Sequence, residues 1–123
     1  MSERTNDCFG SKEGFRAGLQ GMQQRTAALY KALPKPMRAL NHLSLVSYSD
    51  GSLSTGTKEL MALAIAVATG CEGCALHHVE AARKHGVTRE EVAESIGVAI
   101  AMGGGPSVVY GAIALAAFDE FRS

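Results

Sequence analysis

The hydrophobic positions of this chain recur at α-helical spacing along most of its length. Residues three, four or seven apart share a helix face, so apolar residues at these intervals mark one buried side. The pattern covers residues 11–33, 36–46, 55–69, 71–85, 88–102 and 106–123. No segment alternates apolar and polar residues over the length that a β-strand needs. We therefore predict an all-α fold, a helical bundle of about six helices.

Proline and glycine mark the boundaries between these segments. Proline fits the first turn of a helix, so we expect Pro36 to begin the second helix. Gly70 separates the third and fourth segments with almost no loop, which favours an antiparallel or steeply angled pair. Residues 55–69 are apolar on nearly every side, so this helix should be central. Residues 103–105 are interpreted as a turn, since a phosphate-binding P-loop needs a preceding strand and a following lysine.

Length and charge limit the class of protein. At 123 residues we expect a flexible leader over residues 1–10 and a single helical domain over residues 11–123. The 12 basic and 12 acidic residues balance, so neither nucleic acid nor an anionic membrane is an expected partner. Because the apolar stretches are too short to span a bilayer and no signal peptide is visible, we expect a cytoplasmic protein.

The candidate chemistry is concentrated in residues 71–78, CEGCALHH. On a helix Cys71, Cys74 and His78 share one face, and His77 is turned about 100° away. The motif follows a glycine and should open a helix, whose N-terminus stabilises the reactive thiolate form of cysteine. In the cytosol such a pair is typical of redox or metal chemistry. Cys8 has no partner at a comparable spacing and is interpreted as incidental.

A glutamate in the preceding helix is positioned to meet the second histidine. Glu59 lies about 16 Å before Gly70 along the third helix, and His78 about 12 Å after it, at 1.5 Å per residue. If the two helices pack side by side, the carboxylate could reach the imidazole and raise its basicity. The histidine could then take the proton of Cys74. Alternatively, Glu59 only stabilises the start of its helix.

The spacing from Glu59 through Cys71 and Cys74 to His78 resembles the AhpD-like (alkylhydroperoxidase D) branch of the carboxymuconolactone decarboxylase family. The resemblance covers about residues 53–120. It implies an all-helical protein that assembles as a homo-oligomer, a trimer or hexamer, and reduces hydroperoxides in antioxidant defence. It also implies that Cys74 attacks the peroxide. Cys71 would be the more exposed, resolving thiol, and His78 and Glu59 would relay the proton.

The same resemblance implies a Cys71–Cys74 disulfide that an external dithiol or a lipoyl-type group reduces, with no metal, haem or nucleotide cofactor. Two neighbouring residues qualify this reading. His77 adjoins the matched histidine and is an auxiliary candidate that could compete as the base. Glu72 lies between the cysteines, where a second negative charge opposes thiolate formation.

Three other functions remain open from the sequence. The cysteine pair would equally serve a thiol–disulfide oxidoreductase or a redox sensor without peroxide turnover. A carboxymuconolactone decarboxylase-like enzyme would share the fold, although such members generally lack the paired cysteines. A zinc-binding module could use Cys71, Cys74 and His78, but structural zinc sites usually draw ligands from two separated pairs.

Overall fold

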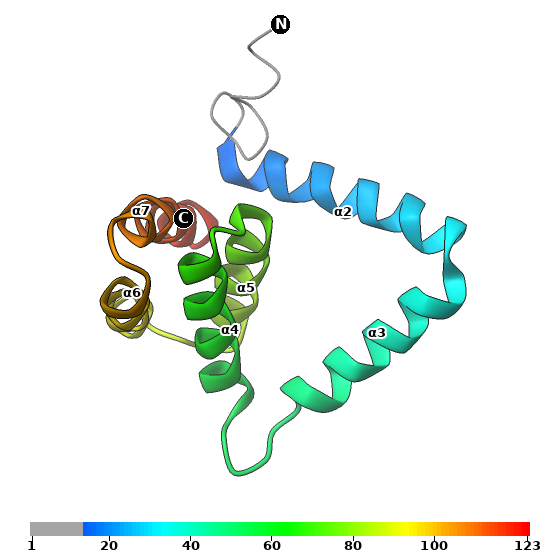
Figure 1. Cartoon of the computed structure of the whole chain (residues 1–123), viewed down its shortest axis with the longest axis horizontal. Helices are drawn as coiled ribbons and strands as arrows, with labels where there is room; N and C mark the ends of the chain where they lie inside the picture. Colours follow the sequence, from blue (N-terminus) through cyan, green and yellow to red (C-terminus); the bar gives the residue numbers. More distant parts are fainter. Residues whose placement is uncertain (1–13) are drawn as a thin grey trace, which may run out of the picture.

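The computed structural model describes residues 14–123, which form six α-helices (Figure 1). In chain order they are α2 (Gly14–Ala32), α3 (Pro34–Tyr48), α4 (Thr55–Thr69), α5 (Glu72–Lys84), α6 (Arg89–Gly103) and α7 (Gly105–Phe121). These residues contain no β-strand, which confirms the all-α prediction. Among them, no helix combines the length and apolar character needed to cross a bilayer. The leader expected over residues 1–10 lies outside the described part of the chain.

Helices α4 to α7 pack together as a four-helix bundle. Helix α4 contacts each of the other three, as its apolar surface predicts. Leu63, Leu76 and Val92 are fully buried at 0% exposure and lie in one hydrophobic core. Helices α6 and α7 approach closely at Gly111, where an added Cβ would lie 2.4 Å from the Ile96 side chain. The bundle therefore has a hydrophobic core of its own.

The bundle turns are defined by local backbone chemistry. Gly70 ends α4 with φ +75°, the left-handed conformation that glycine adopts at little cost. The N–H of Cys71 then donates to the Ala66 carbonyl at 2.9 Å, so α5 begins directly beside the end of α4. Helix α6 begins with a capping box, in which Thr88 and Glu91 each bond the other's backbone N–H. The turn at Gly70 places the cysteine motif at the start of α5.

Helices α2 and α3 form an arm, residues 14–48, that extends away from the bundle and returns to it (Figure 1). The break between them falls at Leu33, because Pro34 and Pro36 both lie in the first turn of α3. The prediction that Pro36 begins this helix was therefore wrong by two residues. Leu19 is buried in α2, whereas α3 has no buried residue. Helix α3 is consequently helical without burying its own apolar positions.

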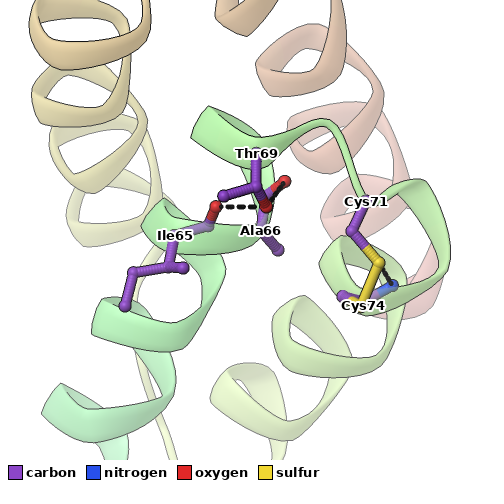
Figure 2. Close-up of a disulfide and its surroundings, with 5 residues drawn as sticks. All are labelled: Ile65, Ala66, Thr69, Cys71 and Cys74. Atoms are coloured by element: carbon purple, nitrogen blue, oxygen red, sulfur yellow. Dashed lines mark hydrogen bonds between the residues drawn. A yellow bond between two sulfur atoms is a disulfide. The ribbon is translucent and has the colours of Figure 1, made fainter.

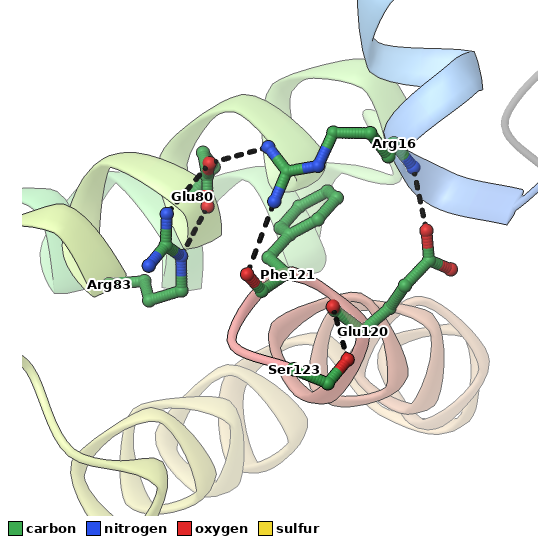
Figure 3. A network of polar contacts seen from close by, with 6 residues as sticks. All are labelled: Arg16, Glu80, Arg83, Glu120, Phe121 and Ser123. Carbon is green, nitrogen blue, oxygen red and sulfur yellow. Dashed lines mark hydrogen bonds and ion pairs between the residues drawn. The ribbon is translucent and has the colours of Figure 1, made fainter.

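The first turn of α2 is bound to the end of α7 (Figure 3). The Glu120 carboxylate accepts hydrogen bonds from the backbone N–H groups of Phe15 at 3.0 Å and Arg16 at 2.9 Å. A carboxylate is favourable there because the first N–H groups of a helix have no intrahelical partner. This contact attaches the start of the arm to the bundle.

A second contact joins the same turn to α5 (Figure 3). The buried Glu80 carboxylate pairs with Arg16 at 2.8 Å and with Arg83 at 2.6 Å. Arg16 also donates to the Phe121 carbonyl at 3.1 Å and stacks over that ring. Burial acts to raise the pKa of Glu80, but the hydrogen bonds from Arg83 and Arg16 outweigh it and lower that pKa. The buried carboxylate of Glu80 thus anchors the first turn of α2 to the bundle.

Candidate functional site

Cys71 and Cys74 form a disulfide at the start of α5 (Figure 2). Cys71 is the N-cap residue, and its Sγ accepts a hydrogen bond from the Cys74 N–H at 3.3 Å. Figure 2 shows the disulfide beside the last turn of α4, where Thr69 bonds back to the carbonyls of Ile65 and Ala66. In the reduced protein the same N-cap position stabilises a Cys71 thiolate, because the helix N-terminus is partially positive.

The relative exposure of the two cysteines is opposite to the expectation. Cys74 is exposed, whereas Cys71 is only partly exposed, so the prediction of a more exposed Cys71 was wrong for this chain. The reason is the tight turn before α5. The Cys71 backbone is bonded to the Ala66 carbonyl and lies against α4, while Cys74 is three residues further on, within the first turn of α5. An external reagent therefore reaches Cys74 more easily.

His78 lies one turn beyond Cys74 on α5 and is held by Glu59 of α4. The Nδ1 atom of His78 and the Oε1 atom of Glu59 are 2.7 Å apart, and Glu59 is only 7% exposed. The contact between Glu59 and His78 that the helix spacing allowed is therefore present. When Nδ1 carries the proton that the carboxylate accepts, Nε2 is left free to take a proton from another group. The arrangement can therefore supply a base beside the cysteine pair.

His77 has a different environment from its neighbour. Its ring meets the His78 ring edge-on, with centroids 4.9 Å apart, and it makes no hydrogen bond to a carboxylate within residues 14–123. Burial of the ring, followed by the charge of His78, lowers the pKa of His77. Glu59 thus orients His78 and not His77. Glu72, which lies between the two cysteines, has its pKa raised by burial.

Tyr48, the last residue of α3, also lies at the site, which the sequence did not reveal. Its ring centroid is 5.6 Å from that of His78. Burial and then the charge of Glu59 raise the pKa of Tyr48, so its hydroxyl stays protonated at neutral pH. The Tyr48 carbonyl accepts a hydrogen bond from the Thr55 hydroxyl at 2.7 Å, which ties the end of the arm to the start of α4. No sequence signal could show this return of the arm.

The cysteine pair opens into a pocket that we call the site pocket, with a volume of about 220 Å³. Its lining residues are Tyr48, Ala62, Ile65, Ala66, Thr69, Cys71, Cys74 and His78. A neighbouring pocket of about 280 Å³ shares Tyr48, Ala62 and Ile65 and continues past Met61 along α4. The walls are largely apolar, so an organic molecule could lie along α4 with one end at the sulfur atoms.

The described part of the chain offers no set of ligands for a zinc ion. No three Cys, His, Asp or Glu side chains within residues 14–123 are arranged to hold a metal ion. The sulfur atoms of Cys71 and Cys74 are bonded to each other. Cys8 lies outside the described residues.

Comparison with known proteins agrees with this architecture. The sequence profile of the carboxymuconolactone decarboxylase family matches residues 34–117. A Cupriavidus necator protein without an assigned function is 42% identical over 105 residues, which are 85% of this chain and 93% of that protein.

Two solved structures share the fold. A carboxymuconolactone decarboxylase family protein from Legionella pneumophila has a TM-score of 0.82 at 41% identity, covering 85% of this chain and 94% of that one. A family member from Thermotoga maritima, for which involvement in the antioxidative response has been suggested, has a TM-score of 0.76 at 22% identity. The match covers 85% of this chain and 89% of that one, and at this identity it bears on the fold alone.

Proposed function

This chain belongs to the carboxymuconolactone decarboxylase family, and we propose that it is an AhpD-like, thiol-dependent hydroperoxide reductase. The observation that carries the proposal is the 2.7 Å contact between Glu59 and His78, one helical turn from a cysteine pair that can form a disulfide. A structural cysteine pair would not require a buried carboxylate that orients a neighbouring imidazole. The apolar site pocket favours an organic hydroperoxide over hydrogen peroxide.

The proposed reaction begins at the exposed Cys74. Its thiol proton passes to His78 Nε2, and the thiolate attacks the terminal peroxide oxygen. The O–O bond breaks, the alcohol leaves with the proton held by His78, and Cys74 becomes a sulfenic acid. Cys71 then attacks the Cys74 sulfur, and the proton of its thiol passes to the departing hydroxide, so that the disulfide forms and one water molecule is released. An external dithiol, such as a lipoyl-type group, supplies two electrons by thiol–disulfide exchange and restores both thiols.

Thiol–disulfide exchange without peroxide turnover is the second candidate function. It is favoured by the exposure of Cys74 and by the N-cap position of Cys71, which would stabilise the thiolate that leaves when the disulfide is attacked. Decarboxylation is less well supported, because it leaves the cysteine pair without a role.

The test is the response of the reduced protein to one equivalent of cumene hydroperoxide. We expect loss of the two thiols of Cys71 and Cys74, a mass decrease of about two units, and recovery with dihydrolipoamide. Cys74→Ser should abolish peroxide consumption. His78→Ala should slow it by about 10²–10⁴-fold, the usual contribution of a general base. His77→Ala is the matched control and should change the rate far less.

The outcomes separate the two candidates. Peroxide left unconsumed, with the thiol count unchanged, would overturn the reductase proposal. Rapid exchange with protein disulfides combined with that result would favour the second candidate. Equal rate losses in His77→Ala and His78→Ala would remove the role assigned to the Glu59 contact. A Cys8→Ser background keeps the third thiol from confusing the count.

A further inference from the structure

The site pocket does not end at the cysteine pair but continues along α4. The neighbouring pocket of about 280 Å³, which we call the outer pocket, shares Tyr48, Ala62 and Ile65 with it. Because three residues line both pockets, one extended molecule can occupy the two together. A molecule that reaches the sulfur atoms can therefore also contact the residues at the far end of the outer pocket.

One face of α4 lines this path from end to end. Four residues spaced by four, three and four positions share that face: Lys58, Ala62, Ile65 and Thr69. Ala62 and Ile65 are apolar, and Met61, which is 50% exposed, adds a further apolar side chain at the edge. The path is thus apolar between a lysine near the start of α4 and the disulfide beside its end.

The lysine has capacity to bind an anion. Among the lining residues of the outer pocket in the range 14–123, Lys58 alone is charged. Its Nζ donates a hydrogen bond to the Ser49 carbonyl at 2.8 Å, and it forms no ion pair with any carboxylate within that range. An ammonium group has three N–H donors, so two of them remain available.

The carboxylates closest to Lys58 in sequence and in charge have other partners. The Asp50 carboxylate accepts a hydrogen bond from the Thr55 N–H at 2.7 Å, which is the main cause that lowers the pKa of Asp50, with Lys58 a smaller one. Glu59 follows Lys58 directly but is turned toward α5, where its carboxylate contacts His78 at 2.7 Å. Neither carboxylate therefore occupies the remaining donors of Lys58.

The length of this path along α4 sets the length of a ligand that joins its two ends. Ala66 lines the site pocket beside the cysteines, and from residue 58 to residue 66 the helix advances about 12 Å at 1.5 Å per residue. An extended hydrocarbon chain advances about 1.25 Å per carbon, given C–C bonds of about 1.5 Å and angles near 111°. A chain of about ten carbons therefore spans the path.

We propose that the outer pocket binds the carboxylate end of a fatty acid hydroperoxide. Lys58 pairs with the carboxylate, the alkyl chain lies along the apolar face of α4, and the peroxide reaches Cys74 about ten carbons away. The Ser47 hydroxyl, which also lines the outer pocket, supplies a second donor. This inference names the substrate class and rests on the proposed function. Lipids whose carboxyl group is esterified lack the charge and should be poorer substrates.

The first test compares linoleic acid hydroperoxide with its methyl ester in the same nonionic detergent. The ester keeps the chain and the peroxide but not the charge. In the wild type we expect KM for the acid to be about twofold to fivefold lower than KM for the ester, the size of effect of a partly exposed ion pair. The two kcat values should be similar, because a contact remote from the reacting atoms stabilises ground state and transition state equally.

Variants of Lys58 assign this preference to the ammonium group. Lys58→Met keeps the length of the side chain and should remove the preference for the acid, whereas Lys58→Arg keeps the charge and should retain it. Lys31→Met is the matched control, because it removes an exposed lysine at the end of α2. It should retain the preference in full.

A second pair of variants changes the wall without touching the lysine. Met61→Glu places a carboxylate three residues from Lys58 on the helix, where it can pair with the ammonium group and repel the acid. It should therefore abolish the preference for the acid, while Met61→Gln, of similar size and uncharged, should keep it. Met61 is half exposed, so neither change affects the core.

A binding measurement separates this inference from the proposed reaction. Ricinoleate is a hydroxy fatty acid that resembles the alcohol product and cannot oxidise a thiol. Isothermal titration calorimetry below its micelle concentration should show binding to the wild type, weakened about twofold to fivefold in Lys58→Met. Binding of this kind without any peroxide consumption would leave the carboxylate site in place and overturn only the reductase proposal.

The opposite results overturn the carboxylate site. Equal KM values for acid and ester in the wild type would show that no charge is recognised. A preference that survives in Lys58→Met would place its origin elsewhere on the protein. Peroxide reduction accompanied by either result would leave the proposed function standing without this substrate class.

Discussion

The bundle and the arm are both helical, but different forces make them so. In the bundle, Leu63 and Leu76 are at 0% exposure, and all four helices contribute buried residues to one core. In the arm, Leu40 and Leu43 are more than half exposed, and only the N-terminal part of α2, through Leu19 and the polar contacts of its first turn, is packed on the bundle. The difference shows that an apolar helical pattern predicts a helix but does not predict whether the apolar side of that helix is buried.

The candidate site lies where these two regions meet. The bundle supplies the chemical groups Cys71, Cys74, His78 and Glu59 on the rigid pair α4 and α5. The arm supplies Tyr48, which borders the site pocket. A group on a well-packed element keeps its geometry, whereas one on a weakly packed element depends on what holds that element. We therefore expect changes in the two regions to have unequal effects.

The largest contrast should come from equivalent leucine truncations. Leu63→Ala removes a fully buried side chain and should lower the free energy of unfolding by about 2–5 kcal/mol. Leu43→Ala in the arm should change it by about 0.5 kcal/mol or less at protein concentrations where the chain is monomeric. Urea denaturation of both variants measures the difference. Equal losses would show that the arm is packed as tightly as the bundle.

Substitution of Glu80, which anchors the arm, should have an intermediate and pH-dependent effect on the free energy of unfolding. Glu80→Gln leaves Arg16 and Arg83 without their carboxylate and should cost about 1–3 kcal/mol at neutral pH. Because folding lowers the pKa of Glu80, its contribution is present above the ordinary carboxyl value of 4.5. That contribution is lost as the pH falls through the lowered pKa of the folded state. Denaturation at several pH values measures it.

The control for this experiment is Glu94→Gln, which changes an exposed glutamate. It should leave monomer stability and its pH dependence nearly unchanged. If Glu80→Gln kept its deficit undiminished in strong acid, the loss would reflect packing and not the charge of the carboxylate.

The smallest effect should come from the arm residue at the site. Tyr48→Ala removes the ring beside His78 and should lower kcat/KM for an organic hydroperoxide about threefold to tenfold, as expected for an aromatic contact of about 0.5–1.5 kcal/mol. Tyr48→Phe keeps the ring and should be close to wild type. Because burial and Glu59 raise the pKa of Tyr48, this variant should also keep the pH profile below pH 10. A large loss in Tyr48→Phe would give the hydroxyl a chemical role.

The sequence alone determined the helices and most of their ends. The 3.6-residue apolar period, the capping box of Thr88 and Glu91, and the glycine at position 70 are local signals, and each is realised in the structure. Burial was less predictable. Val98 and Ala99 are adjacent apolar residues of α6, yet the structure buries Ala99 and leaves Val98 63% exposed. Neighbouring residues on one apolar helix cannot be ranked until the partner helix is known.

Tertiary structure decided how the site is assembled. Helix spacing allowed Glu59 to meet His78, but only the packing of α4 on α5 makes the 2.7 Å contact and leaves His77 without a carboxylate. The exposure of Cys74 and the place of Tyr48 had no sequence signal. Both follow from long-range packing, the first from how α5 lies against α4 and the second from the return of the arm to Thr55. Local backbone chemistry specifies where a helix begins, whereas the neighbours of a side chain depend on every other element that packs around it.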